Sequence, residues 1–138
     1  MHTSEPPARK RPARGRILVV DDNVDAADTL AMLLEFLDYE TRTAYDGRQA
    51  LQAAESWQPD LVILDINMPV LDGYAAAREF RAAHRSPRVV LVALTARSLP
   101  TDQAAAEAAG FDVHLTKPVD GGQLAGVVEH ALQERRHA

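Results

Sequence analysis

Hydrophobic residues fall into two alternating patterns along this chain. Short apolar or β-branched segments, which are typical of buried strands, come first in each pair. Stretches in which apolar residues recur every three or four positions, which are typical of helices, follow them. The five predicted strands are Ile17–Val20, Tyr39–Ala44, Leu61–Leu64, Val89–Leu94 and Val113–Thr116. The chain is therefore predicted to contain five successive strand–helix units.

A helix is predicted after each strand, with ends set by capping and breaking residues. The expected cap of the first helix is Asn23 or Asp25, and that of the fourth is Thr101 or Asp102. The fourth helix should end at Gly110. The predicted helices cover residues 24–37, 50–54, 74–81, roughly Gln103–Ala109, and 124–132. Five such units predict an α/β fold with a doubly wound, five-stranded parallel sheet, helices on both faces and right-handed crossovers.

The composition narrows the class of protein. A chain of 138 residues suits a single domain. The sequence has no cysteine, which excludes disulfide frameworks, thiolate metal ligands and cysteine nucleophiles. No run resembles a membrane span or a secretory signal, so a cytoplasmic protein is expected.

The net charge of −5 is unevenly distributed. Residues 1–16 carry five basic side chains and one acidic, whereas the rest of the chain carries ten basic and nineteen acidic. Residues 1–15 lack apolar periodicity and are predicted to form a disordered basic tail before a domain at residues 16–138. The tail could touch a phosphate backbone or an anionic membrane, but a solvated tail is expected. The acidic domain is not expected to bind DNA or a membrane directly.

Polar residues follow four of the five predicted strands. Asp21 and Asp22 follow the first strand, Asp65 the third, Thr95 the fourth and Lys117 the fifth. The carboxyl ends of parallel strands meet at one edge of the sheet, where open α/β folds place their chemistry. Each acid alone could be a helix cap, but five polar residues at the ends of four strands favour a shared site.

The residue types in this set point to phosphoryl chemistry. Three carboxylates in one cleft repel one another unless a cation lies between them. Oxygen ligands without cysteine or histidine favour a hard ion, above all Mg²⁺, with Mn²⁺ as a substitute. Lys117 adds an ammonium group and Thr95 a hydroxyl, so the pocket suits a small multiply charged anion. A phosphoryl group fits, and Asp65 could receive it as an acyl phosphate.

The motifs around these residues resemble those of the receiver domain of bacterial two-component response regulators. They are Leu18-Val-Val-Asp21-Asp22-Asn23, Leu64-Asp-Ile-Asn-Met-Pro-Val-Leu-Asp-Gly73, Leu94-Thr95-Ala96 and Thr116-Lys117-Pro118. Their order and spacing together are specific, and the likeness covers roughly residues 16–135. The resemblance implies a flavodoxin-like fold of five strand–helix units with strand order 2-1-3-4-5.

The resemblance also implies how the phosphoryl group is held and sensed. Asp65 is the expected phosphoacceptor, and Lys117 contacts the phosphoryl group and forms a cis bond to Pro118. Thr95 is expected to move toward the phosphoryl oxygens and so to start the conformational change. Many members have Tyr or Phe three residues before the lysine, where this chain has His114. His114 could act as the switch residue, in which case the switch could be pH-sensitive, or it could be a surface histidine without a signalling role.

A second group of implied roles concerns metal binding and the lifetime of the phosphoryl group. Mg²⁺ is expected to bind the side chains of Asp22 and Asp65 and the backbone carbonyl of Asn67, and Asp21 is expected to bind it either directly or through water. Asn67 and Arg97 occupy the two positions that tune the dephosphorylation rate in such domains.

The function implied by the resemblance is a phosphorylation-dependent signalling switch in a two-component phosphorelay. A sensor histidine kinase or a histidine phosphotransfer protein would phosphorylate Asp65. An unidentified protein would then read the change at the fourth helix, fifth strand and fifth helix. Since no effector domain is recognisable in the chain, the domain could also act only as a phosphate sink. It is not expected to be an enzyme beyond catalysing its own phosphorylation and slow dephosphorylation.

Two alternatives come from other classes of protein. A Mg²⁺-dependent phosphohydrolase with an aspartyl-phosphate intermediate usually has a second acid two residues after the nucleophile. Here that residue is Asn67, which cannot transfer protons. A flavin-binding protein on a similar sheet would need a phosphate-binding loop after the first strand, where Asp21 and Asp22 would repel phosphate.

Overall fold

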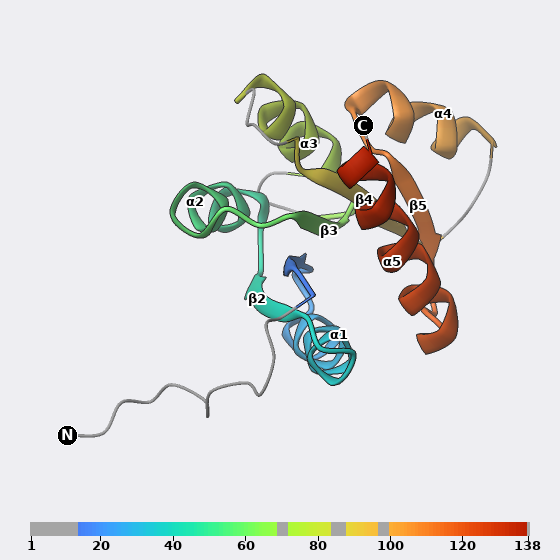
Figure 1. Cartoon of the computed structure of the whole chain (residues 1–138). Helices are drawn as coiled ribbons and strands as arrows, with labels where there is room; N and C mark the ends of the chain where they lie inside the picture. Colours follow the sequence, from blue (N-terminus) through green and yellow to red (C-terminus); the bar gives the residue numbers. More distant parts are fainter. Residues whose placement is uncertain (1–13, 69–71, 84–87, 97–99, 138) are drawn as a thin grey trace.

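Strands and helices alternate along the chain in the computed structural model, which describes residues 14–68, 72–83, 88–96 and 100–137 (Figure 1). The strands are β1 (Arg16–Val20), β2 (Glu40–Ala44), β3 (Leu61–Asp65), β4 (Val90–Thr95) and β5 (Val113–Thr116). The helices are α1 (Val24–Phe36), α2 (Gly47–Trp57), α3 (Gly73–Ala82), α4 (Pro100–Ala109) and α5 (Gly121–His137). Every predicted strand and helix is therefore present, with ends that differ by a few residues.

The five strands form one parallel sheet in the order β2-β1-β3-β4-β5. This order confirms the predicted doubly wound α/β fold. β3 lies at the centre, with Leu64 beside Val20 of β1 and Asp65 beside Leu94 of β4. Because all strands point the same way, the residues that follow them converge on one edge of the sheet.

Side chains of the strands alternate between two cores, one on each face of the sheet. On β1, Ile17 and Val19 belong to the core under α1 and α5, whereas Leu18 and Val20 belong to the core under α2, α3 and α4. Figure 1 shows these two groups of helices on opposite sides of the sheet. Burial on both faces explains why the runs of β1, β3 and β4 are continuous rather than alternating.

Four of the described helices begin with a side-chain cap. Asn23, Asp46 and Asp72 each accept a hydrogen bond from the backbone N–H three residues further on, at the starts of α1, α2 and α3. At the start of α5, the Asp120 carboxylate accepts the backbone N–H of the residue two positions further on, at 3.2 Å. Such caps satisfy backbone donors that have no partner inside the helix. Of the two caps predicted for the first helix, Asn23 is therefore the one used, and Asp25 lies in the first turn.

The start of α4 differs from the prediction. The helix begins at Pro100 rather than near Gln103, so Thr101 and Asp102 lie inside it instead of capping it. Proline fits the first turn of a helix because its φ is already helical and it has no N–H to satisfy. The prediction treated this proline as part of the loop and therefore began the helix too late.

Arginines from other elements contact the carboxyl ends of three helices that have no basic residue in their last turn. The bonds run from Arg14 to the carbonyl of Leu37 (3.4 Å), from Arg16 to that of Trp57 (2.7 Å) and from Arg81 to that of Gly110 (2.9 Å). The last carbonyls of a helix lack intrahelical donors, which such side chains supply. Acidic and amide groups thus gather where helices begin, and arginines where they end.

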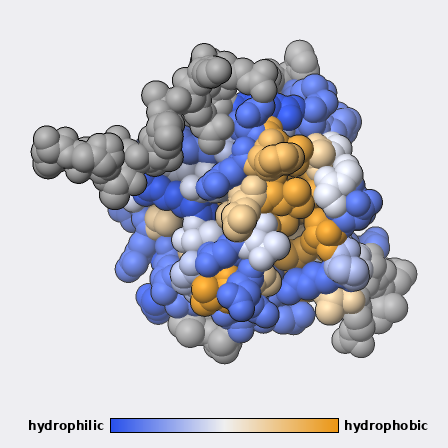
Figure 2. Space-filling view, turned by 90° about the horizontal axis from the view of Figure 1, so that it is seen from below, coloured by the Kyte–Doolittle hydropathy of each residue, from blue (hydrophilic) through white to orange (hydrophobic). Residues whose placement is uncertain are grey.

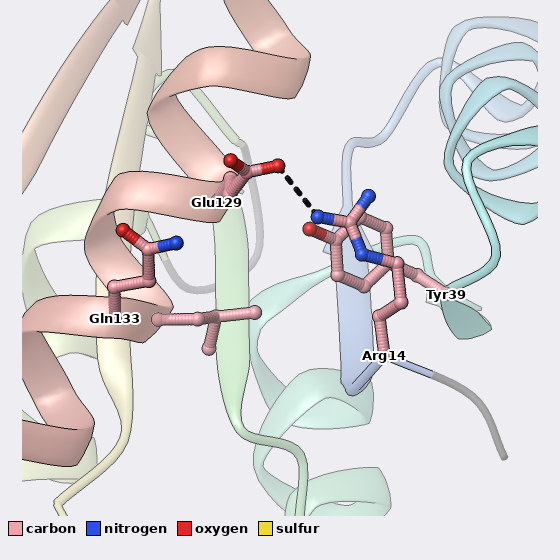
Figure 3. A pocket seen from close by; sticks show the side chains of 5 residues that line it. Arg14, Tyr39, Glu129 and Gln133 are labelled. Atoms are coloured by element: carbon pink, nitrogen blue, oxygen red, sulfur yellow. Dashed lines mark hydrogen bonds and ion pairs between the residues drawn. The ribbon is translucent and has the colours of Figure 1, made fainter.

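Arg14, which the sequence pattern assigned to the tail, lies against the folded domain. Its guanidinium pairs with Glu129 of α5 at 2.6 Å and lies 4.9 Å from the centroid of the Tyr39 ring (Figure 3). These residues, with Leu132 and Gln133, line a pocket of about 190 Å³. Pockets for small ligands usually exceed roughly 300 Å³, so we assign no ligand to this one.

Within the described part of the chain, the large apolar side chains that are well exposed belong to α1. They are Val24 (47% exposed), Met32 (69%) and Phe36 (87%). Figure 2 shows hydrophobic side chains gathered on the face that lies at the bottom of Figure 1, where α1 lies. A surface of this kind is typical of a contact site. None of the described helices is long and apolar enough to cross a bilayer.

Candidate functional site

Two buried carboxylates define the candidate site. Asp21 directly follows β1 and Asp65 is the last residue of β3, and these two strands are neighbours in the sheet. Asp21 is 2% exposed and Asp65 is 4% exposed. Burying a charged group is costly unless it is paired and hydrogen-bonded, so the partners of these two acids determine what the site can do.

Both carboxylates are held in the same way. One oxygen of each, Oδ1, accepts the backbone N–H of the residue two positions further on, Asn23 for Asp21 (3.0 Å) and Asn67 for Asp65 (2.9 Å). The other oxygen, Oδ2, faces the ammonium group of Lys117, at 3.3 Å for Asp21 and 3.2 Å for Asp65. Lys117 therefore bridges two buried acids, and both oxygens of Asp65 have a fixed orientation.

These surroundings shift the pKa of both Asp65 and Lys117. The pKa of Asp65 is raised, because burial and repulsion from Asp21 outweigh the Asn67 hydrogen bond and the charge of Lys117. For Lys117, burial opposes the charged form, but the two carboxylates outweigh it and raise the pKa. Lys117 is therefore charged at neutral pH. A further positive charge nearby would stabilise the ionised form of Asp65.

A third acid completes a set that suits a divalent cation. Asp22 is exposed, and one of its carboxylate oxygens lies within 4.8 Å of oxygens from Asp21 and Asp65. The single charge of Lys117 does not balance three carboxylates. The donors are all oxygen atoms, which are the ligands that Mg²⁺ prefers. The residues present therefore fit a magnesium ion, and the exposed Asp22 leaves the cluster open to solvent on one side.

Thr95 and His114 lie on neighbouring strands. Thr95 ends β4 and is 3% exposed, and its carbonyl accepts the backbone N–H of Lys117 at 2.7 Å. In β5, Thr116 is paired with Thr95 and His114 with Ala93. Alternate residues of a strand share a face, so the half-buried His114 lies on the same face of the sheet as Thr95. The structure thus places the two predicted switch residues close together.

Three further predictions concern the Lys117–Pro118 bond, Asn67 and Arg97. The Lys117–Pro118 peptide bond is cis, as the resemblance implied. Asn67, two residues after Asp65, is exposed, and its backbone N–H donates to Oδ1 of Asp65. Arg97 lies outside the described residues.

Gly73 has a role in the site that the sequence pattern did not reveal. It is the first residue of α3, and its N–H donates to the carbonyl of Ile66 at 3.3 Å. A β-carbon at this position would lie 2.5 Å from Ile66 Cα and 2.7 Å from the carbonyl oxygen of Asp65. The sequence suggested only a turn at Asp72-Gly73, whereas the structure shows that Gly73 lets α3 begin directly against the backbone of Asp65.

Asp22→Ala is expected to stabilise the metal-free protein. The change removes one of three clustered carboxylates and relieves their repulsion, and because Asp22 is exposed the gain should be about 0.5 kcal/mol. Thermal unfolding in EDTA measures the effect. Asp25→Ala removes the same charge from the first turn of α1, outside the cluster, and should be neutral or slightly destabilising. A melting temperature of Asp22→Ala below that of the unaltered protein would contradict the repulsion.

Residues 17–129 match the family model of the response regulator receiver domain. The transcriptional regulatory protein PrrA of Mycobacterium tuberculosis is 40% identical over 120 residues, which cover 87% of this chain and 51% of PrrA. The chain therefore spans about half the length of the curated relatives it matches.

Two solved structures show the same fold. The receiver domain of the sensor histidine kinase PA1611 of Pseudomonas aeruginosa PAO1, which has a magnesium ion in its active-site cleft, is 35% identical. Its TM-score is 0.80, and the match covers 88% of this chain and 99% of that one. The chemotaxis protein CheY4 of Vibrio cholerae is 28% identical with a TM-score of 0.81, again over 88% of this chain and 99% of that one.

Proposed function

Because the chain belongs to the response regulator receiver domain family, we propose that it is a phosphorylation-dependent switch in which Asp65 accepts the phosphoryl group. The position of Asp65 carries the proposal. This buried carboxylate lies 3.2 Å from the ammonium of Lys117 and within one cluster with Asp21 and Asp22. A nucleophile, a cation for phosphoryl oxygens and a set of metal ligands thus share one site.

In the proposed reaction, an oxygen of Asp65 attacks the phosphorus of a phosphohistidine on a kinase or phosphotransfer protein. The O–P bond forms while the P–N bond breaks, and the electron pair of that bond leaves with the imidazole of the donor. The N–H of Asn67 keeps the Asp65 carboxylate oriented during the attack. Lys117 then turns from the carboxylate oxygen to an oxygen of the phosphoryl group, which carries more charge.

The proposed metal ligands are the carboxylates of Asp21, Asp22 and Asp65 and the backbone carbonyl of Asn67. A bound Mg²⁺, or Mn²⁺ in its place, neutralises charge on the phosphoryl oxygens. The magnesium ion in the cleft of the PA1611 receiver domain supports this choice of metal. Three carboxylates beside one lysine would otherwise repel the incoming group.

We propose that the protein that donates the phosphoryl group binds along α1. The helix begins two residues after Asp22, so its first turn lies beside the acidic cluster. Steps of about 100° per residue place the exposed residues Val24, Met32 and Phe36 within roughly 120° on one side of the helix. A helical protein that carries a phosphohistidine could cover this apolar side while its histidine reaches Asp65.

The proposed output begins at Thr95. Its hydroxyl moves toward the phosphoryl oxygens, and His114 on the adjacent strand responds on the same face of the sheet. The change then reaches α4, β5 and α5, where another protein binds. The domain acts through protein contacts rather than by binding DNA, and it catalyses only its own phosphorylation and slow dephosphorylation, at a rate set by Asn67 and Arg97.

Incubation with acetyl phosphate and Mg²⁺ tests the proposal. We expect one phosphoryl group per chain, lost in mild alkali as an acyl phosphate is, and located on Asp65 by peptide mass spectrometry. A label on another residue would contradict the assignment. Steady turnover of a phosphate monoester would favour the phosphohydrolase instead.

Lys117→Ala is expected to uncouple phosphorylation from switching. Without the ammonium group, labelling by acetyl phosphate should slow roughly a hundredfold. The phosphorylated fraction should lack the shift of the Thr95 amide resonance that the unaltered protein shows. Arg48→Ala removes an exposed cation from the start of α2 and should change neither quantity. A Thr95 shift of full size in Lys117→Ala would contradict the role given to the lysine.

A further inference from the structure

Arg81, in the last turn of α3, joins this helix to the segment before β4 and to the loop between α4 and β5. Its Nε donates to the carbonyl of Gly110 (2.9 Å), Nη1 to the carbonyl of Val89 (2.6 Å) and Nη2 to the carboxylate of Asp112 (2.5 Å). Only 20% of the side chain is exposed. Charge-assisted bonds to a half-buried guanidinium are strong and directional, so these contacts fix the loop between α4 and β5.

Gly110 is adapted to this contact. Its φ is +110°, in the region that favours glycine, and a β-carbon there would lie 2.7 Å from Cγ of Arg81. The N–H groups of Gly110 and Phe111 return to the carbonyls of Glu107 and Ala106, each at 3.0 Å. This pair of bonds is the Schellman pattern that closes a helix. The carboxyl end of α4 is thus fixed by its own backbone and, from outside, by Arg81.

Asp112 connects the same end of α4 to the sheet. Its carboxylate accepts the N–H of Leu91 at 2.9 Å, and its own N–H donates to the carbonyl of Leu91 at 2.8 Å. The other carboxylate oxygen pairs with Arg88 at 2.6 Å, and that side chain is 61% exposed. Asp112 is therefore shared by two arginines, of which Arg81 also bonds to Gly110, the residue directly after α4.

The body of α4 is held by small side chains. Among residues 103–109, the part of α4 whose side chains the structure describes, the buried ones are Ala106 and Ala109, each 3% exposed. Alanine buries little apolar area, so this packing stabilises the helix less than a buried aromatic side chain such as Phe80 stabilises α3. The amino end of α4 begins five residues after Thr95.

We propose that Arg81 is a positioning residue that makes α4 a lever. By fixing the carboxyl end of the helix at Gly110, it causes a displacement at Thr95 to swing the amino end instead of shifting the whole helix. The role of Thr95 rests on the function proposed above. We call the contacts of Arg81 with Gly110, Val89 and Asp112 the clamp. Without it, a displacement at Thr95 would move the amino end of α4 less. A protein that binds α4 would then distinguish the phosphorylated from the unphosphorylated form less well.

Hydrogen exchange of the full chain, followed by mass spectrometry, tests the clamp with Arg81→Gln and the matched control Arg88→Gln. Both changes remove one partner of Asp112, but only the first removes the bond to Gly110. In the unphosphorylated protein, Arg81→Gln should speed exchange of residues 106–111 about tenfold, and Arg88→Gln less than about twofold. Gly110→Ala, whose β-carbon displaces Arg81, should speed exchange of the same peptides.

The same measurement on protein loaded with beryllofluoride and Mg²⁺ tests the lever. The change in protection at the start of α4 should be at least halved in Arg81→Gln relative to the unaltered protein. Unchanged exchange at residues 106–111, or faster exchange in β1 and β3 as well, would overturn the clamp. An equal response to beryllofluoride in both proteins would overturn the lever. If beryllofluoride changes nothing in the unaltered protein, the proposed function fails and the clamp stands on the first measurement.

Discussion

Asp65→Asn is expected to abolish labelling by acetyl phosphate while leaving the fold intact. The amide has nearly the size of the carboxylate and can still accept the N–H of Asn67, but it is not a nucleophile and is a poorer metal ligand. Labelling should therefore fall to background. Burial and Asp21 raise the pKa of Asp65, which means that its charged form is disfavoured in the fold. The melting temperature in EDTA at neutral pH should thus rise.

Asp46→Asn is the matched control for this change. Asp46 lies at the same edge of the sheet and caps α2 by accepting the N–H of Gln49 at 2.8 Å. Asparagine caps a helix about as well as aspartate, so both labelling and stability should be retained. Undiminished labelling of Asp65→Asn would show that another carboxylate is the phosphoacceptor.

Gly73→Ala is expected to be the most destabilising single-methyl change in this site. The new β-carbon would lie 2.5 Å from Ile66 Cα and 2.7 Å from the Asp65 carbonyl oxygen, and both are backbone atoms that cannot rotate away. The start of α3 and the end of β3 must separate, at a cost of roughly 2–4 kcal/mol. Urea unfolding measures the loss. Labelling of Asp65 should slow as well, because its backbone is displaced.

Gly126→Ala is the opposite case and serves as the control. A β-carbon at this position in α5 would meet no atom within 4 Å apart from the neighbouring backbone of its own helix. Alanine has the higher helix propensity, so this change should stabilise the protein by about 0.5–1 kcal/mol. If Gly73→Ala costs less than about 0.5 kcal/mol, the close approach of α3 to Asp65 does not constrain the fold as argued.

Much of the site could be predicted because its residues occupy the ends of strands. The apolar runs locate the strands, and a parallel sheet brings their carboxyl ends to one edge. Asp21, Asp65 and Lys117 are 44 to 96 positions apart in pairs, yet they meet as expected. The strand order came from the family resemblance, because a local apolar pattern does not encode which strands are neighbours.

The features that escaped prediction depend on backbone approach rather than on residue type. Gly73 looks like a turn glycine in the sequence, and Gly110 was correctly predicted to end the fourth helix. What escaped prediction is that each also leaves space for atoms from another segment. Arg81 falls among apolar positions of the third helix, and its main partner, Gly110, is 29 residues away. Nothing in the local pattern marks such a pair. The early start of α4 at Pro100 was missed for a different reason, because proline favours both loops and first helical turns.

The direction of the helices gives the acidic cleft an electrostatic support that no side chain provides. In a sheet of parallel strands with helical crossovers, every helix runs back against the strands, so all five amino ends face the edge that holds Asp21 and Asp65. The aligned peptide dipoles place partial positive charge at those ends. Arginines at the opposite edge balance the negative ends. This backbone field would offset part of the repulsion between the three carboxylates and a phosphoryl group on Asp65. Because the backbone produces it, substitution of side chains cannot remove it.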